Sequence, residues 1–252
     1  MQYSFFRCVL FAMALCMPIW VSAASLNQAA WVPDSGRYHF GYRSIPNIRI
    51  TKAPADTDWK RWAMLHDGAA YRLYFFRQGS RTQLYQFAFN RSSNAYEYGY
   101  NQSIPILTLV GAPEDADFSS FSMLHDGQDY RLYVRPKGNP KALYQFAWVP
   151  DTATYQFGYR SIPKMDITGF PEDADWRRWQ MLHDGNDYRL YVFVAGGYQF
   201  YQGAFKRETE NYEYSYRSIP VLTLVGVPED SNRHSAAMLH DGDHYRFYFQ
   251  AP

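Results

Sequence analysis

The chain has 252 residues, of which 47% are hydrophobic and 19% are charged, so it has enough apolar material for a folded core and is not intrinsically disordered. Its formal net charge is only +1, which argues against nucleic acid or an anionic membrane surface as the partner. The aromatic fraction of 19%, with 23 Tyr, is high and favours β-strands and partly wet binding surfaces.

Residues 1–24 have the pattern of a secretory signal peptide. Arg7 is the only charged residue, an apolar run extends from Cys8 to Val21, and small residues follow at 22–24. We expect cleavage here, which predicts a secreted or periplasmic protein with no membrane span after cleavage. An uncleaved anchor is the alternative, although the apolar run is short for a membrane span.

The mature domain is expected to comprise residues 25–252. Both cysteines, Cys8 and Cys16, lie in the signal segment, so the mature domain would rely on burial and strand pairing rather than on disulfides. Removal of Arg7 also leaves equal numbers of basic and acidic residues, since the chain has 25 of the former and 24 of the latter.

The mature chain contains four diverged copies of one unit. Met-Leu-His-Asp-Gly occurs four times, each time followed after two residues by Tyr-Arg-(Leu/Phe)-Tyr, and Ser-Ile-Pro also occurs four times. Both series recur in steps of 59, 58 and 57 residues. These matches in register predict a single four-repeat domain. The series begin at Met64, Met123, Met181 and Met238, and at Ser44, Ser103, Ser161 and Ser218.

The copies alternate in type. Copies 1 and 3 share Trp-Val-Pro-Asp, which begins at Trp31 and Trp148, and a Trp-x-x-Trp pair. Copies 2 and 4 share Tyr-Glu-Tyr and Leu-Thr-Leu-Val-Gly instead. The order is therefore A-B-A-B, which indicates that a double unit of two repeats was duplicated.

Within one unit the apolar residues alternate with a period of two, which predicts strands. We expect four strands per unit, through the segments that end at His-Asp-Gly, Tyr-Arg-Leu-Tyr, Leu-Tyr-Gln-Phe and Tyr-x-(Phe/Tyr)-Gly-Tyr. Asp67-Gly68 between the first two predicts a hairpin turn. A Pro-containing connection is expected to follow, with a single helical turn at residues 115–121.

The two ends of the mature chain are offset within the repeat. Residues 26–31 are a diverged copy of residues 143–148, whereas the last copy stops after residues 245–249, one strand earlier. The first strand is therefore the one that the last unit lacks. This predicts an all-β fold in which four repeats form a closed ring, with a four-bladed β-propeller and terminal strand exchange as the preferred architecture.

The order of these signals resembles the hemopexin-type repeat. Gly-Tyr-Arg-Ser-Ile-Pro is followed by Gly-Phe-Pro at Gly169, Asp-Ala-Asp at Asp173 and Asp-Gly-x-x-Tyr at Asp184, as that family has Gly-Tyr-Pro, Gly-x-Pro, an Asp-Ala strand and Gly-x-x-Tyr-Phe-Phe. The unit is longer than that family's blade, and the cysteines of its usual disulfide are missing. The resemblance implies a four-bladed propeller with calcium or another ion in a central channel, and binding of protein, matrix or haem.

The histidines of His-Asp-Gly have two interpretations. Four imidazoles around a channel or in four pockets would bind a transition metal or haem. Alternatively, Asp-Gly makes the turn and the His bonds to nearby backbone. We favour the second interpretation, because a hairpin repeated four times needs its turn four times. The histidines are His66, His125, His183 and His240.

Paired carboxylates form a second repeated series, with two interpretations of its own. Carboxylates two residues apart can bind calcium, or they cap the turn that follows. The second use is favoured here. The pairs are Asp56/Asp58, Asp115/Asp117 and Asp173/Asp175.

Two further sets are candidate ligand-binding residues. The Trp pairs of copies 1 and 3 either form a platform for a sugar ring or a partner's side chain, or pack in the core. Ala237 of copy 4 stands at the position of Trp62, which favours exposure of at least one ring. The Arg of Tyr-Arg-(Leu/Phe)-Tyr binds a carboxylate or sugar hydroxyl, or pairs with an Asp of a neighbouring unit. These residues are Trp59, Trp62, Trp176 and Trp179, and Arg72, Arg131, Arg189 and Arg246.

The function expected from these features is binding rather than catalysis. Every prominent His and Asp recurs four times, and no catalytic arrangement stands out. The preferred hypothesis is an exported, multivalent, lectin-like protein that binds a glycan, because repetition of weak sites increases avidity. Haem or metal binding through the repeated histidines and a protein-binding propeller are the alternatives.

Overall fold

The computed structural model describes residues 24–101, 104–229 and 231–251. The predicted signal peptide, residues 1–24, lies outside the described residues except for Ala24. In the described part of the chain, no helix is long and apolar enough to cross a membrane. The fold is all-β, as predicted, with 20 strands and two short 3-10 helices in these residues.

Each repeat contains five strands in the same order, and the N-terminal strands complete the last repeat. The chain begins with β1 (Ser25–Val32), η1 (Pro33–Ser35), β2 (Arg37–Phe40) and β3 (Ile48–Thr51). The next repeat has β4 (Thr57–His66), β5 (Tyr71–Arg77), β6 (Gln83–Asn90), β7 (Ala95–Tyr98) and β8 (Ile106–Val110). Then follow β9 (Ala116–His125), β10 (Tyr130–Pro136), β11 (Ala142–Val149), η2 (Pro150–Thr152), β12 (Thr154–Phe157) and β13 (Lys164–Thr168). The remaining strands are β14 (Ala174–His183), β15 (Tyr188–Val194), β16 (Gln199–Lys206), β17 (Asn211–Tyr214), β18 (Val221–Val225), β19 (Asn232–His240) and β20 (Tyr245–Gln250).

The first three strands of a repeat form an antiparallel sheet. In the repeat of His66, β4 pairs with β5 and β5 pairs with β6. The hairpin closes where His66 lies opposite Tyr71, and Gly68 in its turn has a φ of +84°, which glycine adopts without strain. The predicted hairpin is therefore present.

Two details of the strand prediction were wrong. The third strand, β6, pairs along one half with β7 and along the other with β8. The Pro-containing connection thus holds a fifth strand, which extends the sheet outward. Residues 116–121 belong to β9 rather than to a helical turn, because they pair with β10 on both sides of an irregularity in register.

The two ends of the chain pair with each other, as their offset predicts. β1 runs antiparallel to β20, with Leu26 opposite Gln250 and Ala30 opposite Arg246. β1 therefore occupies the place in the last sheet that β6 occupies in the first complete repeat.

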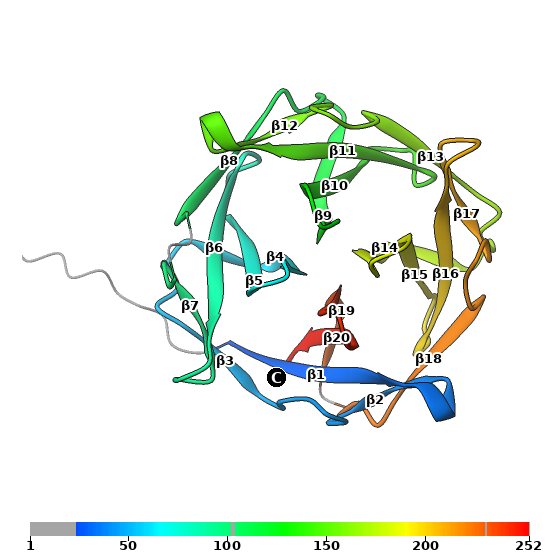
Figure 1. Cartoon of the computed structure of the whole chain (residues 1–252), viewed down its shortest axis with the longest axis horizontal. Coiled ribbons are helices and arrows are strands. Elements are labelled where there is room, and N and C mark those ends of the chain that lie inside the picture. The colour runs from blue at the N-terminus through cyan, green and yellow to red at the C-terminus, as the bar shows by residue number, and fades with distance from the viewer. Residues whose placement is uncertain (1–23, 102–103, 230, 252) are drawn as a thin grey trace, which may run out of the picture.

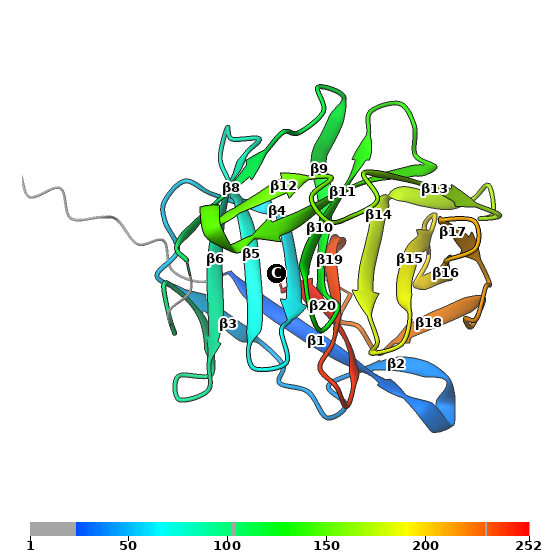
Figure 2. The same cartoon turned by 45° about the horizontal axis from the view of Figure 1, so that its top comes forward.

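The repeats join into a propeller-like ring of strands (Figure 1). Outer strands of neighbouring repeats pair in parallel, namely β3 with β7, β8 with β12, β13 with β17 and β18 with β2. The result is a closed outer ring of 12 strands whose sides are β1, β6, β11 and β16. The innermost strands β4, β9, β14 and β19 are foreshortened in Figure 1 and run lengthwise in Figure 2, so they stand along the axis of the ring.

The hydrophobic core is divided into four clusters, one between each two neighbouring repeats. One cluster joins Phe76 and Leu84 of one repeat to Phe121 and Phe146 of the next. The other three clusters repeat this construction around the ring. Because the apolar strand faces meet a neighbouring repeat, ring closure completes the burial of the first and last repeats.

Candidate ligand-binding site

Four cavities of the same construction lie where one repeat meets the next. We call them boundary cavities and name each after its repeated arginine. The Arg189, Arg72, Arg131 and Arg246 cavities have volumes of about 290, 150, 350 and 370 Å³. Each is lined by Arg, Tyr and Gln side chains and the isoleucine of Ser-Ile-Pro from one repeat, and by three aromatic side chains of the next.

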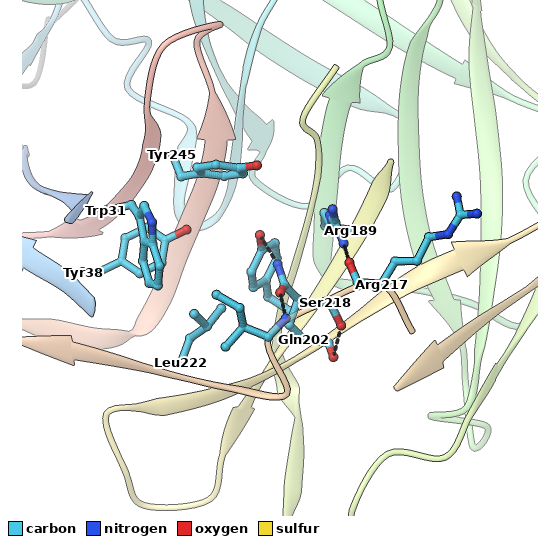
Figure 3. A pocket seen from close by; sticks show the side chains of 10 residues that line it. Trp31, Tyr38, Arg189, Gln202, Arg217, Ser218, Leu222 and Tyr245 are labelled. Atoms are coloured by element: carbon cyan, nitrogen blue, oxygen red, sulfur yellow. Dashed lines mark hydrogen bonds between the residues drawn. The ribbon is translucent and has the colours of Figure 1, made fainter. Parts of the chain in front are cut away.

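The Arg189 cavity shows the arrangement (Figure 3). One repeat contributes Arg189 from β15, Gln202 from β16 and the loop before β18. Across the boundary, Trp31 from β1, Tyr38 from β2 and Tyr245 from β20 line the other side. The N-terminal strand therefore builds part of a cavity as well as closing the ring.

Each repeated Arg is paired with the Asp of its own His-Asp-Gly turn. The Nε atom of Arg72 lies 2.9 Å from Asp67, and that of Arg189 lies 2.7 Å from Asp184. Arg131 and Arg246 are paired with Asp126 and Asp241 in the same way. The prediction that this Arg pairs with an Asp of a neighbouring unit is therefore wrong, because the hairpin brings its own Asp closer.

The neighbouring unit instead supplies a tyrosine hydroxyl to the same carboxylate. Tyr188 donates to Asp126 at 2.7 Å, and Tyr71 donates to Asp241 at 2.8 Å. Burial would raise the pKa of Asp126, but hydrogen bonds from the Asp129 backbone, Arg131 and Tyr188 outweigh it and lower the pKa to about 2. The carboxylate therefore stays ionised and links two repeats at neutral pH.

The same Arg also holds the loop at the edge of its cavity. Arg246 Nη1 donates to the carbonyl of Arg43 at 2.8 Å, and Arg189 Nη1 donates to that of Arg217. Arg43 and Arg217 have φ values of +40° and +44°, an uncommon backbone conformation for residues other than glycine. The hydrogen bonds to these carbonyls help to maintain the strained loops.

In the Arg189 cavity, a buried Gln connects the floor to the Ser-Ile-Pro loop. Gln202 donates to the hydroxyl of Tyr191 at 2.6 Å, and its amide oxygen accepts the Ile219 N–H at 2.9 Å. Tyr191 in turn meets Tyr38 of the next repeat, whose pKa burial raises well above its usual value. The floor is therefore a linked set of protonated hydroxyls and amides rather than a charged surface.

One aromatic ring at each cavity follows the A-B-A-B order. Trp31 lines the Arg189 cavity and Trp148 the Arg72 cavity. Phe205 and Phe89 take this place in the other two. All four rings are half-buried, so each shows part of its surface to the cavity.

The predicted Trp pairs lie elsewhere. Trp62 and Trp179 are only 3% and 1% exposed, and their indole N–H groups donate to Ser235 and Ser120 of neighbouring inner strands. Trp59 and Trp176 are half-buried against Phe75 and Phe170. None of the four lines a boundary cavity.

The argument for exposure from copy 4 was wrong. Trp62 and Ala237 belong to the same buried cluster, so the large ring of one inner strand fills the space beside the small side chain of another. A platform made of two exposed rings is therefore not formed, because one ring of each pair is in the core.

The repeated histidines stand at the ends of the inner strands. Each ring packs on the Tyr five residues later, with centroids 4.5 to 4.7 Å apart. His183 Nδ1 accepts the Gly185 N–H at 3.3 Å, a local backbone contact of the kind that the structural interpretation requires. Burial lowers the pKa of His66, His183 and His240. Within the described residues, no three His, Cys, Asp or Glu side chains are grouped to hold a metal ion.

The residues near the axis do not fit the calcium ion that the family resemblance implies. A cavity of about 60 Å³ is bounded by all four inner strands, and its charged lining residues are Lys60, Arg61, Arg177 and Arg178. Calcium takes six to eight oxygen ligands, whereas these side chains are cationic donors. The carboxylates nearby, Asp58 and Asp175, are paired with arginines.

Several cavity residues were not identified as site residues from the sequence. Trp31 and Trp148 were visible as the Trp-Val-Pro-Asp motif of copies 1 and 3, and the Ser-Ile-Pro loops as a fourfold repeat. The buried Gln was visible only as part of Leu-Tyr-Gln-Phe. The repeated Arg was identified, and all four copies line the cavities.

No family model matches the chain, and no curated protein matches it in sequence. Similar solved structures include the fucose-specific lectin from Aleuria aurantia, with a TM-score of 0.36 and 11% identity over 86% of this chain and 67% of the lectin. A mutant of that lectin in complex with α-methyl-L-fucoside has a TM-score of 0.35, with the same identity and coverage. Hydrazine synthase from Kuenenia stuttgartiensis has a TM-score of 0.29 and 10% identity over 78% of this chain and 44% of that one. At this level of similarity, the ligands of those proteins say nothing about the ligand of this chain.

Proposed function

We propose that this protein is a non-catalytic, multivalent carbohydrate-binding protein and that the four boundary cavities are its sites. The observation that carries the proposal is the fourfold combination of a half-buried aromatic ring, an arginine and tyrosine hydroxyls in an open cavity. A sugar ring has an apolar face for the aromatic side chain and hydroxyls for the donors.

The arginine has donors to spare for a ligand. A guanidinium carries five N–H groups. In the described structure, those of Arg189 donate to Asp184, Asp187 and the Arg217 carbonyl, which leaves two. Because the paired carboxylates neutralise its charge, this Arg is suited to hydroxyl groups as well as to anions.

The arrangement also supports multivalent binding. We interpret the ring as a four-bladed propeller with one cavity at each blade boundary, so that a branched or repetitive glycan engages more than one site. A second contact then forms at a high effective concentration, which raises avidity without new interactions. Export through residues 1–24 would place these sites in the periplasm or outside the cell.

A glycan-array screen followed by calorimetry tests the proposal. The double variant Trp31→Ala, Trp148→Ala should weaken binding of a glycan identified on the array at least tenfold at two of the sites, which corresponds to about 1.4 kcal/mol per site. Trp59→Ala is the matched control, because Trp59 is half-buried but outside the cavities. No binding on the array, or equal loss in the control, would count against glycan binding at these cavities.

A further inference from the structure

The Ser-Ile-Pro motif places an isoleucine at the rim of every boundary cavity. Ile45, Ile104 and Ile219 are 37%, 37% and 48% exposed, and Ile162 is half-buried. Each lines its cavity. A single exposed apolar side chain needs no explanation. The same one at the rim of four equivalent cavities points to a ligand contact.

Two of these loops are held in place by the side chain of the buried Gln. Ile45 and Ile219 donate their backbone N–H groups to Gln28 and Gln202, each at 2.9 Å. The hydroxyls of Ser44 and Ser218 donate to the backbone carbonyls of the same two Gln residues, each at 3.1 Å. In these two cavities, the buried Gln therefore fixes the backbone of the isoleucine.

A second, nearly buried aliphatic side chain also lines each cavity, and we call it, together with the isoleucine, the apolar corner of that cavity. In the Arg189 cavity this residue is Leu222, which is 3% exposed. Leu107, Met165 and Ile48 line the other three cavities. A sugar hydroxyl buried against aliphatic side chains loses hydrogen bonds to water.

We propose that the ligand presents a methyl group to this corner, and that the isoleucine of Ser-Ile-Pro is a specificity-determining residue. This inference rests on the proposed function and narrows its ligand class. A methyl group removed from water is stabilised, whereas a hydroxyl at the same place is penalised. Two kinds of sugar carry such a group: 6-deoxyhexoses at C6 and N-acetyl sugars at the acetyl carbon.

Calorimetry with matched sugar pairs tests this inference on the unaltered protein. L-fucose with L-galactose and L-rhamnose with L-mannose differ only by a hydroxyl at C6, and N-acetylglucosamine with N-formylglucosamine differs only by the acetyl methyl group. We expect at least one methyl-bearing sugar to bind at least tenfold more tightly than its partner. The pair that discriminates identifies the source of the methyl group.

Variants then connect the discrimination to the isoleucines. Changing Ile45, Ile104, Ile162 and Ile219 to Thr exchanges a rim ethyl group for a hydroxyl and should reduce the discrimination at least threefold, with an unchanged thermal midpoint. Ile106→Thr is the control, because Ile106 is 43% exposed but lines none of the cavities. Should the fourfold variant unfold, the Ile219→Thr single variant must lose discrimination at one site in four.

The possible failures can be told apart. If both members of every pair bind equally well, the methyl inference is overturned and glycan binding stands. If discrimination survives in folded Ile variants, the isoleucines are not its cause. If none of the six sugars and no arrayed glycan binds, the proposed function fails and the inference fails with it.

Discussion

The Trp-bearing and Phe-bearing boundary cavities share one frame and differ in the aromatic ring and in the second aliphatic side chain. In both classes the frame consists of an Asp–Arg pair, a Tyr of the next repeat that is hydrogen-bonded to the same Asp, and a buried Gln. The Arg189 and Arg72 cavities, with Trp31 and Trp148, enclose about 290 and 150 Å³. The Arg131 and Arg246 cavities, with Phe205 and Phe89, enclose about 350 and 370 Å³.

This difference distinguishes residues that maintain the structure of a cavity from residues that vary the surface it presents to a ligand. The side chains that recur in all four repeats make hydrogen bonds within the frame, whereas the ring that differs between A and B repeats faces the cavity. The alternation of A and B repeats therefore gives two pairs of cavities, and we expect the pair with the larger indole and the smaller volume to bind more tightly.

The largest effect on both classes of cavity is expected from deletion of β1. Deletion of residues 25–32 takes away Trp31 from one cavity and Gln28 from another, and it uncovers β20, against which Leu26 and Ala29 are fully buried. A loss of several kcal/mol lowers the thermal midpoint of a domain of this size by at least about 10 °C. Binding should fall to two sites, one of each class.

Thermal unfolding and calorimetric stoichiometry measure these two effects. A synthetic peptide of residues 25–32 added to the deletion variant should raise the midpoint again, whereas a scrambled peptide should not. A deletion variant that melts like the complete chain would show that β1 does not close the ring.

Acidification should weaken both classes of cavity together. Burial lowers the pKa of His66, His183 and His240, so the unfolded chain takes up protons first as the pH falls through about 6.5, and folding stability decreases there. The stabilisation from Asp126 and Asp241, whose pKa values are about 2, is complete above the unfolded value of about 3.9 and is lost as the pH falls towards 2.

This prediction is checked by measuring the thermal midpoint of unfolding between pH 7.5 and pH 3. Ligand binding is measured at each pH at which the protein remains folded. The double variant His66→Gln, His183→Gln should flatten the decrease near pH 6 and leave the decrease below pH 4. Stability that rises between pH 7.5 and pH 5 would contradict the direction of the histidine shifts.

The smallest expected effect comes from exchanging the rings. Wild-type titrations should resolve two tighter and two weaker sites, about three- to tenfold apart, because an indole buries more apolar surface than a phenyl ring, at about 25 cal/mol per Å². The variant Trp31→Phe, Trp148→Phe should give four sites of the weaker kind. Four equal sites in the wild-type protein would show that the ring does not distinguish the classes.

The reverse exchange is the control for the ring exchange. Phe89→Trp with Phe205→Trp should raise the affinity of the other pair, since those cavities are the more spacious ones. If the Phe→Trp variant binds with unchanged affinity while the Trp→Phe variant binds more weakly, the contribution of Trp to binding depends on other residues of the A repeat.

The sequence by itself determined those features of the fold that depend on residues close in the chain or on the repetition of the unit. The repeat, the period of two, the Asp67-Gly68 turn and the pairing of β1 with β20 all follow from local patterns and from the offset of the two ends. The repeated Arg could also be recognised as a cavity residue, because it stands at one fixed position in one strand of each repeat.

Only the tertiary structure decided which aromatic residues face a cavity. Trp62 and Trp148 have similar local surroundings in strands, yet Trp62 is buried against Ala237 and Ser235 of another inner strand, while Trp148 lines a cavity. Likewise, residues 106–110 form strand β8 because their backbone pairs with β6 on one side and with β12 on the other. Exposure depends on the size and chemistry of side chains that neighbouring repeats bring close, and no local pattern specifies those neighbours.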